Sequence, residues 1–268
     1  MTTIDPFTQF KAIQKEGWAA FAPLEAITTM PAAKLVSFAG VANDHNVLDV
    51  ACGTGVVAVT AARRGAKVEG LDLSPALLER ARQNAKTAEV DIDFTEGDVE
   101  ALPYPDARFD VVVSQFGHMF GPRPEVALSE MLRVLKPRGR IAFSTWPPEM
   151  FIGRLFTLVA QYLPPPAGAA PPPLWGEPHV IRERLGDRVV NLEFERDVVL
   201  NPSLSPRHTR QTFETTAAPN IRIKQEYAEK DPDTYARFNA SLENLIAAFS
   251  ENNHVKQHYL MTRATKKG

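Results

Sequence analysis

The chain has 268 residues, of which 44% are hydrophobic and 23% are charged, as in an ordinary globular domain with one substantial core. The formal net charge of -2 argues against a nucleic-acid partner, so the expected ligand is a small molecule. Cys52 is the only cysteine, which excludes an intrachain disulfide framework and a cysteine-rich metal site, and we expect no metal. The first residues lack the apolar core of a signal peptide, and no apolar run approaches the ~18 residues of a membrane span. The sequence therefore predicts a cytoplasmic protein that does not insert into membranes.

Residues 1–45 are predicted to form a helical cap before the first strand. Apolar residues recur at helical spacing through this segment, and Trp18 belongs to the pattern. Pro23 and Pro31 interrupt the pattern and Gly40 ends it, which favours two or three short helices over one long helix.

Strand and helix patterns then alternate through residues 46–146. Such alternation predicts βαβ units on a parallel sheet with helices on both faces. The expected strands are 47–50, 68–71, 92–95, 109–114 and 140–145, and the expected helices are 56–64, 75–86 and 125–135.

The pattern changes after residue 146. The run LPPPAGAAPPP at residues 163–173 cannot be a regular helix or a central strand, and it is either a stiff surface spacer or an ordered loop beside a pocket. The remaining expected elements are helices at 151–163, 178–185 and within 206–250, and strands at 190–200 and 255–263.

The first strand leads into a glycine-rich turn, VLDVACGTG, in which Gly53 and Gly55 let the backbone turn sharply and approach a ligand. Asp49 lies within this strand, Asp72 follows the second strand and Asp98 follows the third. The carboxyl ends of strands in a doubly wound sheet line one crevice, so we expect the three carboxylates to lie there together. Each of them alone is equally consistent with a surface turn. A carboxylate after the second strand suits the two hydroxyls of a ribose.

The glycine turn also satisfies the pattern G-x-G-x-x-A from Gly53 to Ala58, which is typical of nicotinamide-dependent enzymes. Asp49 argues against that interpretation, because it would repel a pyrophosphate four residues before Gly53 and would attract an ammonium group. Two alternatives stay open at this point: an NAD(P)-dependent oxidoreductase, and a non-catalytic cofactor-binding scaffold on the same fold.

Four separated motifs occur in order between about residues 45 and 146: VLDVACGTG, LDLS, EGDVEALPYPDARFDVVVSQFGHMF and EMLRVLKPRGRIAFSTW. Together they resemble the class I S-adenosylmethionine-dependent methyltransferases, most closely the branch that includes ubiquinone and menaquinone biosynthesis methyltransferases. The resemblance implies an α/β fold with a doubly wound, Rossmann-like sheet of seven mostly parallel strands, helices on both faces and an antiparallel last strand. It also implies a single domain over residues 1–268, with the cofactor-binding core at 46–146 and substrate-side insertions and the last strands at 147–268.

The same resemblance implies S-adenosylmethionine as the cofactor and a small molecule as the methyl acceptor. The expected contacts are Asp49, Ala51, Cys52, Gly53, Thr54 and Gly55 for the methionine end, Asp72 for the ribose, Leu73, Asp98 and Val99 for the adenine, and Ser114, Gln115, Phe116 and Trp18 where cofactor and acceptor meet. The sequence departs from the family pattern at two positions. Ala51 stands where many members have glycine, and KPRG at Lys136–Gly139 replaces the commoner Lys-Pro-Gly-Gly turn.

His118, just beyond the fourth strand, is the candidate for a catalytic base, and a local hydrogen bond within a turn is the alternative. A base is optional for thiols, acidic phenols or activated carbon, because positioning alone supplies about 7–11 kcal/mol. Cys52 is expected to pack in the loop rather than to act as a nucleophile. Residues 1–40, 147–180 and 206–250 are expected to build the acceptor pocket, and the last of these segments also a lid or a homodimer surface.

Overall fold

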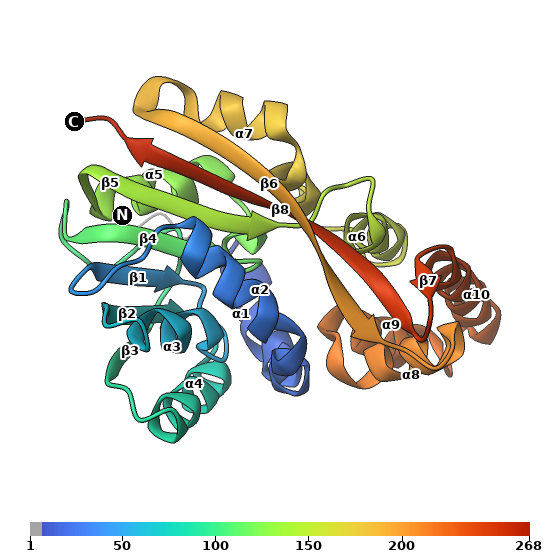
Figure 1. The fold of residues 1–268 in the computed structure, drawn as a ribbon. Coiled ribbons are helices and arrows are strands. Elements are labelled where there is room, and N and C mark those ends of the chain that lie inside the picture. The colour runs from blue at the N-terminus through green and yellow to red at the C-terminus, as the bar shows by residue number, and fades with distance from the viewer. Residues whose placement is uncertain (1–6) are drawn as a thin grey trace.

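The computed structural model describes residues 7–268, and its centre is an eight-stranded sheet (Figure 1). The strands follow the order β3-β2-β1-β4-β5-β8-β6, and the short β7 pairs with β8 outside this path. The expectation of seven strands is wrong by one, because β7 spans two residues and shows no alternating pattern. The strands are β1 Asn46–Val50, β2 Lys67–Asp72, β3 Ile92–Glu96, β4 Phe109–Gln115, β5 Leu135–Thr145, β6 Val189–Pro202, β7 Ser250–Glu251 and β8 His254–Lys266.

Strands β1 to β5 pair with one another in parallel, and β8 runs antiparallel to both β5 and β6. This confirms the predicted mostly parallel α/β sheet with an antiparallel last strand. The strand order changes direction between β1 and β4, which are adjacent in the sheet. The carboxyl ends of these two strands therefore form the switch point at which open α/β sheets bind ligands.

Helices cover both faces of the sheet, and most of their bounds agree with the prediction to within about two residues. The larger difference concerns a strand. The strand predicted at 140–145 begins at Leu135 in the structure, because Leu135 pairs with Phe109 before the register between β4 and β5 shifts. Within residues 7–268, no helix combines the length and the apolar character needed to cross a bilayer. The α-helices are α1 Thr8–Trp18, α2 Glu25–Phe38, α3 Val56–Ala62, α4 Pro75–Thr87, α5 Pro124–Val134, α6 Phe151–Tyr162, α7 Pro178–Leu185, α8 Pro206–Thr216, α9 Ala218–Tyr227 and α10 Pro232–Ala248. The 3-10 helices are η1 Ala19–Leu24, η2 His118–Phe120, η3 Pro172–Gly176 and η4 Gly186–Arg188.

Pro31 does not break the N-terminal helical segment, contrary to the prediction, because α2 continues through it. A proline inside a helix removes one backbone donor and pushes a preceding carbonyl outward. Gln115, at the end of β4, donates its side-chain amide to the carbonyl of Thr28 over 2.8 Å in this part of α2. The proline-containing turn is thereby attached to the carboxyl edge of the sheet.

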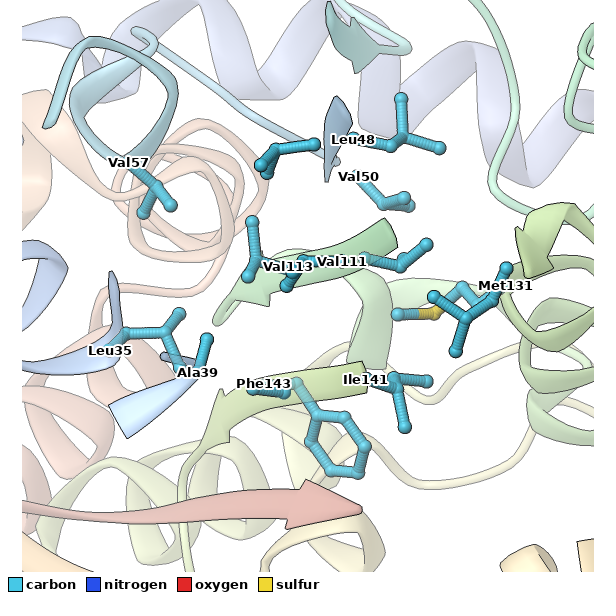
Figure 2. Packing of buried hydrophobic residues seen from close by; sticks show 14 of the residues in the cluster. Leu35, Ala39, Leu48, Val50, Val57, Val111, Val113, Met131, Ile141 and Phe143 are labelled. Atoms are coloured by element: carbon cyan, nitrogen blue, oxygen red, sulfur yellow. The ribbon is translucent and has the colours of Figure 1, made fainter. Parts of the chain in front are cut away.

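The main hydrophobic cluster surrounds the central strands. In Figure 2, side chains of β1, β4 and β5 lie between Leu35 of α2 with Ala39, the residue after this helix, on one side and Met131 of α5 on the other. Leu48 and Val113 are among the fully buried members. Burial of this kind on both faces explains why the sequence of these strands is apolar without a clean alternation.

A second hydrophobic cluster lies where β6 and β8 extend beyond the parallel strands (Figure 1). It is built from α6, α8, α9 and α10 with one end of β8, and Phe213, Phe238 and Leu242 are buried in it. Helix α1 packs closely against α9, because a Cβ added at Gly17 would lie 2.8 Å from the Cβ of Ala218. The N-terminal helices thus lie between the central sheet and this second cluster.

Two turns at the carboxyl edge touch each other tightly. Ala51, after β1, has a φ of 53°, a left-handed conformation that suits glycine better than alanine. A Cβ added at Gly117, after β4, would lie 2.5 Å from the Cβ of Ala51 and 2.6 Å from its carbonyl oxygen. The glycine at 117 is therefore required by the alanine at 51.

We expect Gly117→Ala to lower the free energy of unfolding by about 1–3 kcal/mol, because the new methyl group overpacks this contact. The loss should be smaller in an Ala51→Gly background, which removes one of the two clashing groups. Urea unfolding of the two single variants and the double variant measures the coupling. Equal losses in both backgrounds would contradict the proposed contact.

Candidate functional site

The loop between β1 and α3 has three left-handed residues in five positions. Ala51, Gly53 and Gly55 have φ values of 53°, 55° and 76°. A Cβ at Gly55 would meet Ala81 at 3.0 Å, so this glycine lets the loop pack on α4. A Cβ at Gly53 would have no atom within 4 Å, so this part of the loop borders open space that a ligand can enter.

Asp49 is a buried carboxylate with one unsatisfied oxygen. Asp49 is 1% exposed, and its Oδ2 accepts a hydrogen bond from the backbone N–H of Ala58 over 2.9 Å. Oδ1 has no hydrogen-bond partner among residues 7–268. Burial raises the pKa of Asp49 well above its ordinary value, and the nearby charge of Asp72 adds to this. A donor with positive charge would relieve both effects.

Asp72 lies at the end of β2 and organises two loops. Its Oδ2 accepts from the backbone N–H of Gly53, and its Oδ1 accepts from that of Ser74, each over 2.8 Å. Burial raises the pKa of Asp72 despite these hydrogen bonds. Each oxygen keeps a further lone pair, so the group can still accept from a ligand hydroxyl. The next residue, Leu73, is partly exposed at the same edge.

Asp98 and Val99 follow the end of β3, and Asp98 is joined to the N-terminal helix α1. Asp98 Oδ1 accepts from the backbone N–H of Glu100 over 2.9 Å, and its Oδ2 lies 2.7 Å from Lys11 Nζ. Lys11 also contacts Glu100, which is buried and pairs with Arg123. Sequence reasoning missed Lys11 and Glu100, because only the fold brings α1 to this edge. The acidic pair in EGDVE was the available signal for Glu100.

A second attachment joins the N-terminal helices to the glycine loop. Glu25, in the first turn of α2, accepts from Arg80 Nε over 3.0 Å and from Asn84 Nδ2 over 3.0 Å. The hydrogen bond from Arg80 lowers the pKa of Glu25 against the opposing effect of burial. Asn84 also donates to the carbonyl of Thr54 over 2.9 Å. The side-chain amide of Asn84 therefore connects α4 to both α2 and the glycine loop. No sequence motif indicated this contact.

The end of β4 combines hydrogen bonds with aromatic packing. Ser114 Oγ donates to the carbonyl of Val50 over 2.7 Å, which joins β4 to β1 at the edge. Phe116 has a φ of 61° and stacks on Trp146 with ring centroids 3.9 Å apart. The ring of Tyr259 contacts both of these rings edge-on. Gln115 Oε1 is buried without a hydrogen-bond partner among the described residues.

Trp18 is partly buried and packs on two other rings. Its ring centroid lies 4.7 Å from that of Phe120 and 5.9 Å from that of Phe21. Cys52 is buried, and burial followed by the charge of Asp49 raises the pKa of its thiol. The thiol is therefore protonated at neutral pH and packs near Gly70, where an added Cβ would meet Sγ at 3.1 Å.

His118 lies in the core rather than at an open edge. It is 0% exposed, and neither ring nitrogen has a hydrogen-bond partner among residues 7–268. Its ring packs against Phe143 and Trp175. Burial, with a contribution from Arg184, lowers the pKa of His118 to about 3. This is the environment of a neutral core histidine. A ring that is fully buried does not suit a base that must reach a bound acceptor.

These observations define what the carboxyl edge can bind. Asp49 offers an unsatisfied carboxylate oxygen, Gly53 borders open space, and Asp72 keeps acceptor capacity. An amino acid ammonium and a ribose diol fit this donor and acceptor set. Among residues 7–268, no group of three or more His, Cys, Asp or Glu side chains is arranged to hold a metal ion.

Comparison with known proteins gives matches over the same region and over most of the chain. A family model described as a methyltransferase domain matches residues 47–139. An uncharacterized protein of Mycobacterium tuberculosis is 32% identical over 234 residues, which cover 87% of this chain and 85% of that protein. The demethylmenaquinone methyltransferase of Deinococcus radiodurans is 38% identical over 157 residues, which cover 57% of this chain and 60% of that protein.

Solved structures with low sequence identity share the fold. The YcgJ protein of Bacillus subtilis has a TM-score of 0.58 at 18% identity, with 89% of this chain and 99% of that chain covered. Phosphoethanolamine N-methyltransferase 2 of Haemonchus contortus, solved in complex with S-adenosyl-L-methionine, has a TM-score of 0.55 at 18% identity, with 89% and 52% covered.

The matched region contains the glycine loop and the strand ends whose geometry suits an ammonium and a ribose. A methyltransferase cofactor accounts for the buried carboxylate of Asp49, whereas a nicotinamide pyrophosphate does not. The chain belongs to the class I S-adenosylmethionine-dependent methyltransferases, the family whose cofactor is S-adenosylmethionine.

Proposed function

We propose that this methyltransferase acts on a small acceptor that carries a hydroxylated aromatic ring. The observation that carries the proposal is the stacked pair of Phe116 and Trp146, which follow β4 and β5 and are each 8% exposed, with the buried ring of Tyr259 from β8 packed edge-on against both. Aromatic side chains gathered at a binding edge favour a flat apolar ligand. The name of the Deinococcus radiodurans relative, demethylmenaquinone methyltransferase, supports an acceptor of quinol type.

Two features of the edge support the cofactor contacts proposed from the sequence. Asp49 Oδ1 is an unsatisfied acceptor for the methionine ammonium. The remaining lone pairs of Asp72 can accept from the ribose hydroxyls, and Asp98 with Val99 would border the adenine. When bound, S-adenosylmethionine supplies a methyl group on a sulfonium, so that transfer is a displacement that leaves a neutral thioether.

The described side chains supply positioning rather than a strong base. The hydroxyl of Tyr259 donates to Asp197 over 3.1 Å, and burial together with this carboxylate raises its pKa, so it is not a base at neutral pH. A ring hydroxyl on the acceptor can lose its proton to water, and in-line alignment then provides most of the acceleration. We infer that α1 and α2 exclude water from the edge, to which Lys11 and Glu25 attach them.

The proposed pairing of Asp49 with the ammonium predicts a pH dependence of cofactor binding. The raised pKa means that Asp49 is partly protonated as the pH falls toward that value, whereas an ammonium favours the ionised form. Binding then releases a proton, so the affinity for S-adenosylhomocysteine should fall on acidification from about pH 7.5 to 5, by at most about tenfold per unit. The ligand's own ammonium and carboxylate do not titrate in this range.

Calorimetry over this pH range measures the effect. Asp49→Asn should weaken binding at pH 7.5 and flatten the slope to the contribution of Asp72, whose pKa burial also raises, while the exposed control Asp187→Asn should keep the wild-type profile. A pH-independent affinity of the wild-type protein would rule out an ion pair at Asp49.

The proposed ribose contact predicts that Asp72→Ala weakens S-adenosylhomocysteine binding by about 1.5–3 kcal/mol, the usual contribution of hydrogen bonds to a charged group. Asp93→Ala, at an exposed position on β3, is the matched control and should leave the dissociation constant unchanged. Thermal unfolding checks that the loops attached to Asp72 survive. If Asp72→Ala binds the ligand as the wild type does, this residue is only a turn residue.

The acceptor is tested with methyl-labelled S-adenosylmethionine and a panel of quinols, phenols, thiols, amines and carboxylates. We expect label on the hydroxylated aromatic compounds. Trp146→Leu should raise KM for the acceptor severalfold through loss of aromatic contact, with S-adenosylhomocysteine affinity unchanged. Transfer only to amines, thiols or carboxylates would contradict the proposed acceptor class.

A further inference from the structure

A second candidate site lies at the opposite edge of the sheet, where β1 and β4 begin. A cavity of about 340 Å³ opens there, roughly 16 Å from the carboxyl ends, given the rise of a five-residue strand. It contains no residue of the proposed cofactor or acceptor site. Its lining residues are His45, Asp110, Lys136, Pro137, Arg138, Gly139, Arg140 and Thr265.

Positive charge dominates this cavity although the whole chain has a formal net charge of -2. Lys136, Arg138 and Arg140 line it, and Asp110 is the one acidic lining residue. The carboxylate of Asp110 is already occupied, because it accepts from Lys136 Nζ over 2.7 Å and from the backbone N–H of Asn46 over 2.9 Å. Within residues 7–268, neither Arg138 nor Arg140 forms an ion pair with a carboxylate.

The two arginines are held in different ways. Arg140 donates from one guanidinium nitrogen to the carbonyl of Gly40 over 2.7 Å, and a Cβ at Gly40 would lie 2.4 Å from its other nitrogen. Its guanidinium is therefore fixed at the cavity wall. Arg138 has a φ of 63°, in the turn where the sequence departs from the Lys-Pro-Gly-Gly pattern. A bulky side chain is strained in this conformation, whereas glycine is not.

We propose that this cavity binds the phosphate group of a small phosphorylated metabolite, with Arg138, Arg140 and Lys136 as its cationic contacts. Guanidinium groups present donors in a planar fork that matches phosphate oxygens, and a dianion suits an excess of two cations. The cavity volume is at the lower end of the range for small-molecule sites, which suits a compact ligand rather than a polymer. A strained arginine, in a turn that glycine would fit without strain, supports a binding role for its side chain.

The test uses pyrophosphate and inorganic phosphate as probes in calorimetry with the wild-type chain, at constant ionic strength. We expect saturable binding of pyrophosphate that Arg138→Gly weakens by about tenfold or more, through loss of charge-assisted hydrogen bonds. Arg138→Gly should also raise Tm by about 2–4 °C, because it relieves the left-handed strain. A structural role for Arg138 would instead lower Tm.

The matched control is Arg207→Gly, which removes an exposed arginine in the first turn of α8 and should leave pyrophosphate affinity unchanged. S-adenosylhomocysteine affinity should be unchanged in both variants, which separates this site from the cofactor site. Equal pyrophosphate affinities of the wild type and Arg138→Gly would overturn the proposal. So would absence of saturable binding, or binding of duplex DNA without binding of pyrophosphate.

Discussion

The burial of one ionisable carboxylate at the end of β1 is the constraint around which the carboxyl edge is built. Asp49 is covered on both faces of a parallel sheet and keeps an oxygen without a partner. An unsatisfied buried acceptor costs about 1–3 kcal/mol, which a cationic ligand group can return on binding. The left-handed loop that follows turns Gly53 toward Asp72 and leaves open space beside it. The unsatisfied oxygen of Asp49 therefore both lowers the local stability of this edge and provides an acceptor for a ligand.

Helix α1 is attached to that edge mainly by polar contacts, whereas α2 also packs Leu35 and Val36 into the main hydrophobic cluster. Helix α1 has no fully buried residue of its own, and Lys11 holds it to Asp98 and Glu100. Glu25 and Asn84 connect α2 to the glycine loop. Helix α1 contributes no fully buried residue to the core, so we expect it to separate from the edge at a lower cost than α2. This suits a site that must admit two ligands and then exclude water.

The two edges of the sheet differ in charge and therefore in the ligands they attract. Asp49 and Asp72 place unpaired carboxylates at the carboxyl edge, which suits a sulfonium and an ammonium. Arg138 and Arg140 place positive charge at the opposite edge, beside a cavity. The length of the strands separates the two sets, so the chain can carry both signs of potential with a small net charge.

The sequence alone predicted the parallel sheet and the convergence of its strand ends, because this convergence follows from the doubly wound topology. The cofactor came from the resemblance of four ordered motifs to a known family, since the strand ends by themselves also fit other nucleotides. The sequence also indicated the loop at Gly53 from a local pattern. Only the tertiary structure decided the surroundings of side chains whose neighbours are distant in sequence. His118 follows the same strand as Phe116, yet packing against Trp175 of a later segment buries it. Lys11 reaches Asp98 because the fold lays α1 on that edge, and no local pattern records a contact across 87 residues of chain.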